Sequence, residues 1–234
     1  RLYRAVLALG TVGLLLTVAC GLWLRSYRRQ EALNRQLIAA LVKNDAQKAL
    51  ALVNAGADSN TPCHPSPPPS LRQLWDWLVR RFALPRAAAP NAFTMACGGV
   101  WLESSSIGHM SEADTPQLVQ AMLEHGANKN VKDDRGWTPL ICSVCADYPE
   151  TVRVLLQNGA DVNAKDLSGD SSLFYAVYKT VNGPGLSNTI IGQLLVHGAD
   201  PNLPDLNGIT PLKLVDQSEH PDLVAHLKQA GAKK

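Results

Sequence analysis

One motif recurs along the second half of the chain, and this repetition limits the fold more than any other feature. The motif Asn-x-x-Asp-x-x-Gly-x-Thr/Ser-Pro/Ser-Leu begins at Asn130, Asn163 and Asn202, at intervals of 33 and 39 residues. A second motif, Gly-Ala-Asp/Asn-x-Asn, begins at Gly56, Gly126, Gly159 and Gly198, with an echo at Gly231-Ala232. Repetition at such a period predicts a solenoid, in which each unit packs against its neighbours.

Individual motif positions predict where helices begin and end. Thr138 and Thr210 can each accept a hydrogen bond from a free backbone N–H, and the proline that follows suits the first helical position. Gly159 and Gly198 follow apolar stretches of helical spacing, where a left-handed residue commonly ends a helix. The Asp-x-x-Gly part of the motif predicts a turn. Each unit should therefore hold two helices and a projecting turn.

A 33-residue period that carries these motifs resembles the ankyrin repeat. Residues 134–163 match the family pattern without a gap, except that Ile141 replaces the usual His. The next repeat, 167–202, carries a six-residue insertion between its helices, and the last, 206–234, reads as a polar cap. The resemblance implies an all-α fold: a solenoid of about five helix-turn-helix repeats with β-hairpin fingers.

The repeat motifs and the apolar N-terminal stretch together divide the chain into four parts. Residues 1–30 are predicted to be a transmembrane helix with basic flanks, and residues 31–60 a first, capping repeat. Residues 61–90 form an insertion, and residues 91–234 hold repeats two to five. The inner helix of the second repeat is expected somewhere within Asn91–Leu102.

The insertion combines a proline-rich spacer with an amphipathic segment. Residues 61–69 contain five prolines, which favour an extended spacer. Residues 70–84 predict a helix with one apolar face, bordered by arginines. Two interpretations remain open: the helix folds over the first repeats, which we favour, or it lies on a membrane surface.

The N-terminal segment predicts a membrane anchor. Ala5 to Leu24 are twenty residues without a charge, which as a helix would span about 30 Å, the thickness of a bilayer core. Trp23 near one end suits the interfacial aromatic belt. A cleaved signal sequence, a lipoprotein signal and a buried core helix are the alternatives. No small-x-small cleavage site follows Leu24.

The distribution of charge predicts the orientation of this anchor. Residues 1–90 contain 12 Lys/Arg and 4 Asp/Glu, whereas residues 91–234 contain 10 and 16. Basic residues cluster after the apolar stretch, so the positive-inside rule places residues 25–234 in the cytoplasm. An acidic repeat region does not suggest a nucleic-acid partner; a basic segment beside it suits contact with the lipid bilayer.

Small residues recur on one face of the apolar helix. Gly13, Thr17 and Gly21 are four residues apart, a spacing that allows close helix–helix contact and so a homodimer. The alternative is that small residues are simply common in membrane helices.

No motif of catalytic or cofactor chemistry is present. Five cysteines, an odd number, argue against a disulfide framework. Cys142-x-x-Cys145 falls within an inner helix and has no second pair of ligands, so no metal site is expected. There is no nucleophile elbow, phosphate loop or paired-carboxylate pattern. We therefore predict a protein that is not an enzyme and needs no cofactor.

The resemblance implies that finger tips and inner helices bind another, unidentified protein. The corresponding finger positions are Asp134, Arg135, Trp137, Leu167, Ser168, Asp170, Leu206, Asn207 and Ile209, and those on the inner helices are Cys145, Ala146, Tyr178, Lys179, Gln217 and Ser218. Trp137 and Tyr178 are the predicted anchors, because exposed aromatic side chains supply much contact area.

Together these features predict a non-catalytic scaffold in the membrane, with one transmembrane helix, that recruits a soluble protein. One alternative is a secreted or lipid-anchored protein that acts outside the cytoplasm. Another is a regulatory module of a larger enzyme or channel.

Overall fold

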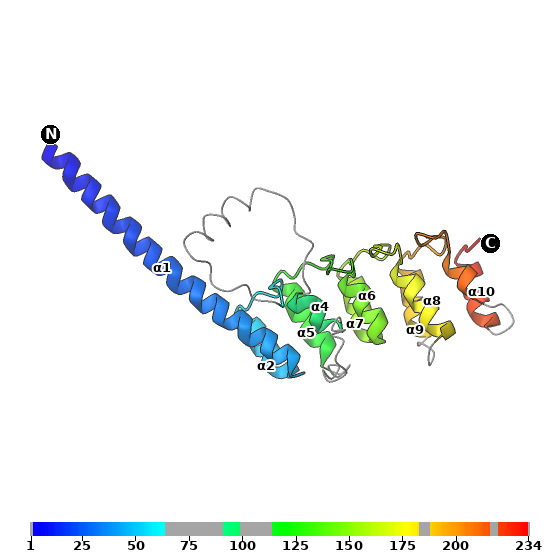
Figure 1. Cartoon of the computed structure of the whole chain (residues 1–234). Helices are drawn as coiled ribbons and strands as arrows, with labels where there is room; N and C mark the ends of the chain where they lie inside the picture. The colour runs from blue at the N-terminus through cyan, green and yellow to red at the C-terminus, as the bar shows by residue number, and fades with distance from the viewer. Residues whose placement is uncertain (1, 64–90, 99–113, 183–187, 216–219, 234) are drawn as a thin grey trace.

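The computed structural model describes residues 2–63, 91–98, 114–182, 188–215 and 220–233, with side chains from residue 21 onward. Within these ranges the chain is a row of helix pairs (Figure 1). The helices in chain order are α1 (Leu2–Val42), α2 (Ala46–Asn54), α4 (Ala92–Ala96), α5 (Thr115–Glu124), α6 (Pro139–Ala146), α7 (Pro149–Gln157), α8 (Ser172–Asn182), α9 (Asn188–Val196), the 3₁₀ helix η1 (Pro211–Leu214) and α10 (Pro221–Gln229).

Five pairs of helices follow one another, as the repeat pattern predicts. The end of α1 packs on α2, the next packed pairs are α4–α5, α6–α7 and α8–α9, and η1 is followed in the chain by α10. Where the structure describes them, the fingers are short turns without strands. The described residues contain no strand, only isolated bridges at Pro62–Asn91 and Lys165–Ser171. Each finger, predicted as a β-hairpin, is a tight turn closed by a backbone hydrogen bond, such as that from the Asp166 N–H to the Asp170 carbonyl over 3.0 Å, together with an aspartate side chain. Its two arms are too short to form strands among the described residues.

Helix ends follow from single residues. The Thr138 hydroxyl accepts a hydrogen bond from the Ile141 N–H over 3.3 Å, as predicted, and Pro139 occupies the first turn of α6. Gly159 and Gly198 follow their outer helices with φ of +73° and +87°, a left-handed conformation that costs glycine little.

Thr210 does not cap its helix, which contradicts the prediction. The segment after it is the four-residue η1, in which the Lys213 N–H bonds the Thr210 carbonyl over 2.9 Å. A 3₁₀ turn closes between residues i and i+3, so it uses the N–H that a capping hydroxyl would need. The Thr210 hydroxyl is buried without a hydrogen-bond partner among the described residues.

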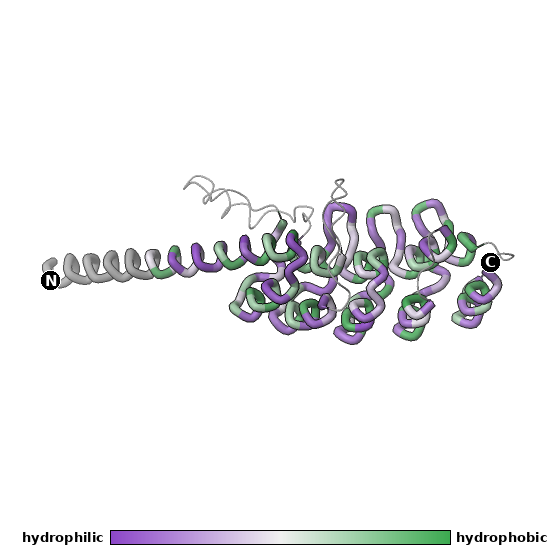
Figure 2. Tube along the Cα trace, turned by 90° about the horizontal axis from the view of Figure 1, so that it is seen from below, coloured by the Kyte–Doolittle hydropathy of each residue, from purple (hydrophilic) through white to green (hydrophobic). Residues whose placement is uncertain are grey.

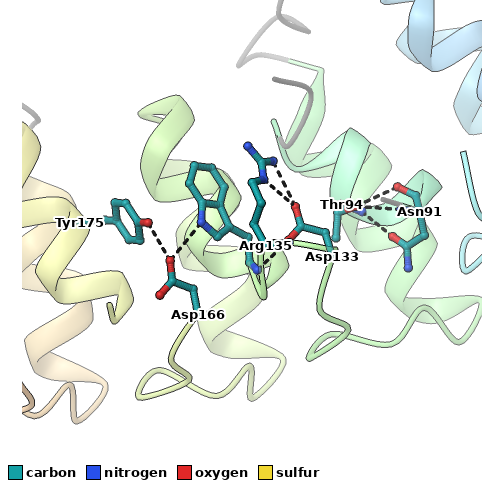
Figure 3. Close-up of polar contacts among 7 residues, drawn as sticks. Asn91, Thr94, Asp133, Arg135, Asp166 and Tyr175 are labelled. Atoms are coloured by element: carbon teal, nitrogen blue, oxygen red, sulfur yellow. Dashed lines mark hydrogen bonds and ion pairs between the residues drawn. The ribbon is translucent and has the colours of Figure 1, made fainter. Parts of the chain in front are cut away.

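The second repeat begins with an asparagine. The Asn91 side chain accepts from the Thr94 N–H over 2.8 Å, and the Thr94 hydroxyl accepts from the Asn91 N–H over 3.1 Å. This reciprocal pair is a capping box, drawn at the right of Figure 3. It starts α4 inside the predicted range 91–102 and buries Phe93 completely.

The predicted anchor and the first inner helix are one continuous helix. In α1, residues 21–29 are exposed, whereas Leu37, Ala40 and Leu41 are buried against the first outer helix. Figures 1 and 2 show α1 extending away from the row of repeats. Among the residues that the structure describes, no helix is long and apolar enough to cross a membrane.

Several predictions concern residues outside this description. They are the side chains of residues 5–20, with Gly13 and Thr17, the helix at 70–84, and the inner-helix positions Gln217 and Ser218. The anchor, the homodimer and the interfacial helix therefore stay predictions.

An asparagine ladder joins neighbouring repeats. The Asn163 side chain donates to the Gly198 carbonyl over 3.1 Å and accepts from the Asp200 N–H over 2.8 Å. Asn60 makes the same two bonds to the second repeat, and Asn202 makes them to the last residues described. The final asparagine of the Gly-Ala-Asp/Asn-x-Asn motif thus aligns each loop with the next one.

Candidate functional site

In the described part of the chain, three turns project from the repeats, and an aspartate holds each one. These fingers are residues 133–137, 166–170 and 205–209. In the second, one carboxylate oxygen of Asp166 accepts from the Ser168 and Asp170 N–H groups, each over 2.8 Å. Asp133 and Asp205 make the equivalent pairs of bonds. Because the aspartate side chain satisfies the turn internally, the finger positions other than the aspartate and the glycine can vary in sequence.

Backbone hydrogen bonds connect the fingers into one row. The Leu167 N–H donates to the Arg135 carbonyl over 3.0 Å, and the Leu206 N–H donates to the Ser168 carbonyl over 3.1 Å. A Cβ atom on Gly136 would lie 2.8 Å from the Leu167 nitrogen, so only glycine permits this approach. The three fingers therefore form a rigid unit.

Asp166 is also the centre of a cluster that joins two repeats. Its second carboxylate oxygen accepts from the Trp137 indole N–H over 3.2 Å and from the Tyr175 hydroxyl over 2.8 Å (Figure 3). The two rings meet edge to face, 5.3 Å apart. Burial and the hydrogen bond to Asp166 raise the pKa of Tyr175 well above its usual value, so its hydroxyl stays a donor.

Trp137 is therefore not the exposed anchor that the sequence predicts. Its indole is half-buried, packs against the core and lies under the Arg135 guanidinium, 4.1 Å from the ring centre. Arg135 in turn pairs with Asp133 over 3.1 Å. The physical reason is that neighbouring fingers are hydrogen-bonded side by side. The side chain of Trp137 therefore reaches the next repeat, where the Asp166 carboxylate accepts its hydrogen bond.

Exposed apolar side chains lie elsewhere on the predicted site. Leu167 and Leu206 occupy equivalent places on neighbouring fingers and are 69% and 75% exposed, and Tyr178 on α8 is 49% exposed. We call these three residues the exposed apolar set. Large, solvent-exposed apolar side chains on a rigid backbone are typical of sites that bind other proteins.

The remaining predicted residues differ in accessibility. Cys145 is buried and contributes only its carbonyl, which accepts a hydrogen bond from the Lys179 ammonium. Exposed positions are Asp134, Ser168 and Asn207, and half-buried ones are Arg135, Ala146, Asp170, Lys179 and Ile209. Direct contact with a partner is therefore open to most of the predicted site, and closed to the Cys145 side chain.

Asp170 has an unusual environment for a finger residue. It occupies the position equivalent to Trp137, but one of its carboxylate oxygens is buried without a partner among the described residues. Burial raises its pKa to about 6, and the negative charges of Asp166 and Asp205 add to this, while Lys165 opposes it. Side-chain hydrogen bonding is therefore less complete between the second and third fingers than between the first and second.

The cysteines of the inner helix are structural. Cys142 and Cys145 both lie on α6, as the repeat alignment predicts, and both are buried. Burial raises the pKa of Cys145 to about 12, so it is a thiol rather than a reactive thiolate at neutral pH. The described part of the chain brings no three metal-binding side chains together.

Two features of the site were missed from the sequence. Tyr175 is one of them, because its partner Asp166 belongs to a finger and its role depends on the fold. The other is a pair on α1, Gln30 and Asn34, whose contacts with the first repeat are described below. Neither lies within a repeat motif, so no periodic signal marks them.

Comparison with known proteins gives a consistent result. A family model described as ankyrin repeats (3 copies) matches residues 107–183. A curated protein of Escherichia coli (strain K12), named "Putative ankyrin repeat protein YahD", is 29% identical over 187 residues, which cover 78% of this chain and 72% of that protein.

Proposed function

Because the chain belongs to the ankyrin-repeat family, whose repeats are a protein–protein interaction module, we propose that it holds a soluble protein at a membrane through its fingers and inner helices. The observation that carries this proposal is the exposed apolar set, Leu167, Tyr178 and Leu206, on a backbone that hydrogen bonds make rigid. A rigid surface loses little conformational entropy on binding, so its apolar area contributes more fully to affinity.

The contact surface combines apolar and polar groups. Leu167 and Leu206 each follow the aspartate that holds a finger, and the exposed Ser168 and Asn207 come next in sequence. Such a mixture suits a partner that presents an apolar side chain together with hydrogen-bonding groups.

The membrane part of the proposal rests on the sequence of residues 5–24 and on the helix that contains them. This apolar stretch continues without interruption into the repeats through α1. The positively charged residues that follow favour a cytoplasmic location of the repeats. In this arrangement a partner bound to the fingers is kept beside the bilayer.

Partner capture by the membrane-embedded chain tests the binding surface. We expect the triple variant Leu167→Ala/Tyr178→Ala/Leu206→Ala to lose the proteins that photo-crosslinking joins to the wild-type chain, while its thermal unfolding stays unchanged. Val196→Ala is the matched control, since Val196 is 84% exposed but lies on the outer helix α9. Undiminished crosslinking by the triple variant would refute the assignment of this surface.

A reporter fused after Lys234 tests the location. Activity of a reporter that works only in the cytoplasm is the expected result. Activity of one that works only outside the cytoplasm would show instead that the chain is exported or reversed in the membrane.

A further inference from the structure

We propose that α1 is a rigid strut that holds the repeats at a fixed height and orientation above an anionic membrane surface. This inference rests on the proposed membrane anchor and goes beyond it, because an anchor alone could equally carry the repeats on a flexible linker. Three observations support it: the continuity of α1, its attachment to the first repeat, and the charges at its exposed middle.

The helix has no break between the apolar stretch and the repeats. It runs through 41 residues from Leu2 to Val42, and neither proline nor glycine occurs between Leu22 and Val42. Helices bend sharply mainly at such residues, so this segment should be straight and stiff. Because Leu37 and Leu41 of the same helix are buried in the first repeat, the strut ends inside the folded domain.

A pair of amides fastens α1 to the first repeat. The Gln30 side chain donates to the Gly56 carbonyl over 2.7 Å, and the Asn34 side chain accepts from the Asp58 N–H over 2.8 Å. At the junctions made by Asn60, Asn163 and Asn202, a single asparagine contacts both of these positions of the loop. Gln30 and Asn34, themselves 3.1 Å apart, thus share the role that a preceding repeat would have.

The exposed middle of α1 carries the chemistry of a lipid interface. Trp23 and Tyr27 stack with their ring centres 5.6 Å apart, and they are 50% and 42% exposed. Arg25, Arg28 and Arg29 are exposed on the same stretch, and none of them pairs with a carboxylate among the described residues. Aromatic rings prefer the headgroup level of a bilayer, and unpaired arginines are attracted to anionic headgroups.

The spacing brings the first repeat close to this surface. Gln30 comes five positions after Arg25, which is about 8 Å along a helix. That is roughly the Debye length at physiological ionic strength. The contact of α1 with the first repeat therefore starts directly after the charged residues, with no flexible segment between them. As a result, the fingers keep one orientation relative to the bilayer.

Distances from the repeats to the bilayer test this inference in the full chain. The chain is reconstituted in phosphatidylcholine vesicles that contain phosphatidylserine. A fluorescent non-canonical residue at exposed Asn54 or Lys228 then reports energy transfer to acceptor-labelled headgroups. We expect one narrow distance distribution at each site. A four-residue Gly/Ser insertion after Arg29 should broaden it by about 10 Å, the span of such a linker.

Matched variants separate the causes. Gln30→Ala/Asn34→Ala should broaden the distributions, while Gln36→Ala, an exposed position on the same helix, should not. The variant Arg25→Gln/Arg28→Gln/Arg29→Gln should broaden the distance distributions. The wild-type chain should show the same broadening in neutral vesicles, which contain no phosphatidylserine. Wild-type distributions as broad as those of the insertion variant would overturn the strut. Double-variant distributions as narrow as the wild type would overturn the role of the amide pair. Failure of the wild-type chain to enter vesicles would instead contradict the anchor itself.

Discussion

The indole N–H of Trp137 in one finger donates a hydrogen bond to the carboxylate of Asp166 in the next, over 3.2 Å. Since Asp166 also holds its own finger and receives the Tyr175 hydroxyl, one side chain fastens two repeats and shapes the surface proposed to bind a partner. Solenoid stability depends on such nearest-neighbour contacts.

Replacing Asp166 should destabilise the fold more than replacing Asp205, its counterpart in the last finger. Asp166→Ala and Asp205→Ala each remove two hydrogen bonds from backbone N–H groups, and Asp205→Ala also removes one from the exposed Asn207 amide. Only Asp166→Ala also leaves the Trp137 and Tyr175 donors unpaired, which should add about 1–2 kcal/mol of destabilisation. Urea unfolding of the chain without residues 1–24 measures the difference. Equal losses would show that the inter-repeat bonds do not stabilise the fold.

Finger glycines should differ in their tolerance of a side chain. Gly169 and Gly208 both have positive φ, +82° and +75°, so alanine should cost each site about 1–2 kcal/mol of backbone strain. A Cβ on Gly169 would also lie 2.8 Å from the Leu206 nitrogen, whereas one on Gly208 meets nothing within 4 Å. Gly169→Ala should therefore cost about 1–3 kcal/mol more in the same unfolding measurement. Similar losses would argue against tight finger packing.

Asp170 should make stability depend on pH. Its pKa is about 6 in the folded chain against 3.8 without the fold, so the folded state binds the proton more tightly. This contribution to stability is complete below about pH 4 and is lost as the pH rises through about 6. Asp170→Asn should flatten the change in melting temperature between pH 4 and 7. At pH 7 the variant should melt about 1–3 °C higher than the wild type, a small rise because solvent screens part of the charge effect. An unchanged pH profile would contradict this account.

The two motif threonines should respond differently to truncation. Thr138→Ala removes the cap of α6 and should cost about 1 kcal/mol. Thr210→Ala removes a hydroxyl that bonds nothing in the described structure and should change stability by less than about 0.5 kcal/mol. Chemical denaturation of both variants checks the contrast, and a larger loss for Thr210→Ala would mean that its hydroxyl has a partner after all.

The sequence predicted the repeats because their signals are local and recur. Pro139, the left-handed Gly159 and the turn aspartates act within a few residues of themselves, so one copy of the motif explains the next. The last repeat shows the limit of this reasoning. Thr210 and Pro211 read as a helix start, yet a four-residue 3₁₀ turn consumes the N–H that the cap would need.

Contacts between repeats were harder to predict. Trp137 looked like an exposed anchor, because its motif position is variable and its ring is large. Its burial depends on Asp166 and Tyr175, which lie 29 and 38 positions further along the chain. The leucines at 167 and 206 could be predicted as surface residues, because each follows a turn aspartate in a projecting finger, and both are exposed.

The central claim is that a membrane-embedded helix carries these repeats, and extraction of membranes at alkaline pH tests it most directly. Membranes from cells that express the chain, and a version without residues 1–24, are washed with carbonate at about pH 11, which removes proteins held only by charge. The account predicts that the complete chain stays in the membrane pellet with residues 5–24 still present by mass spectrometry, while the shortened one is released. Release of the complete chain, or loss of residues 5–24 from the mature protein, would contradict it.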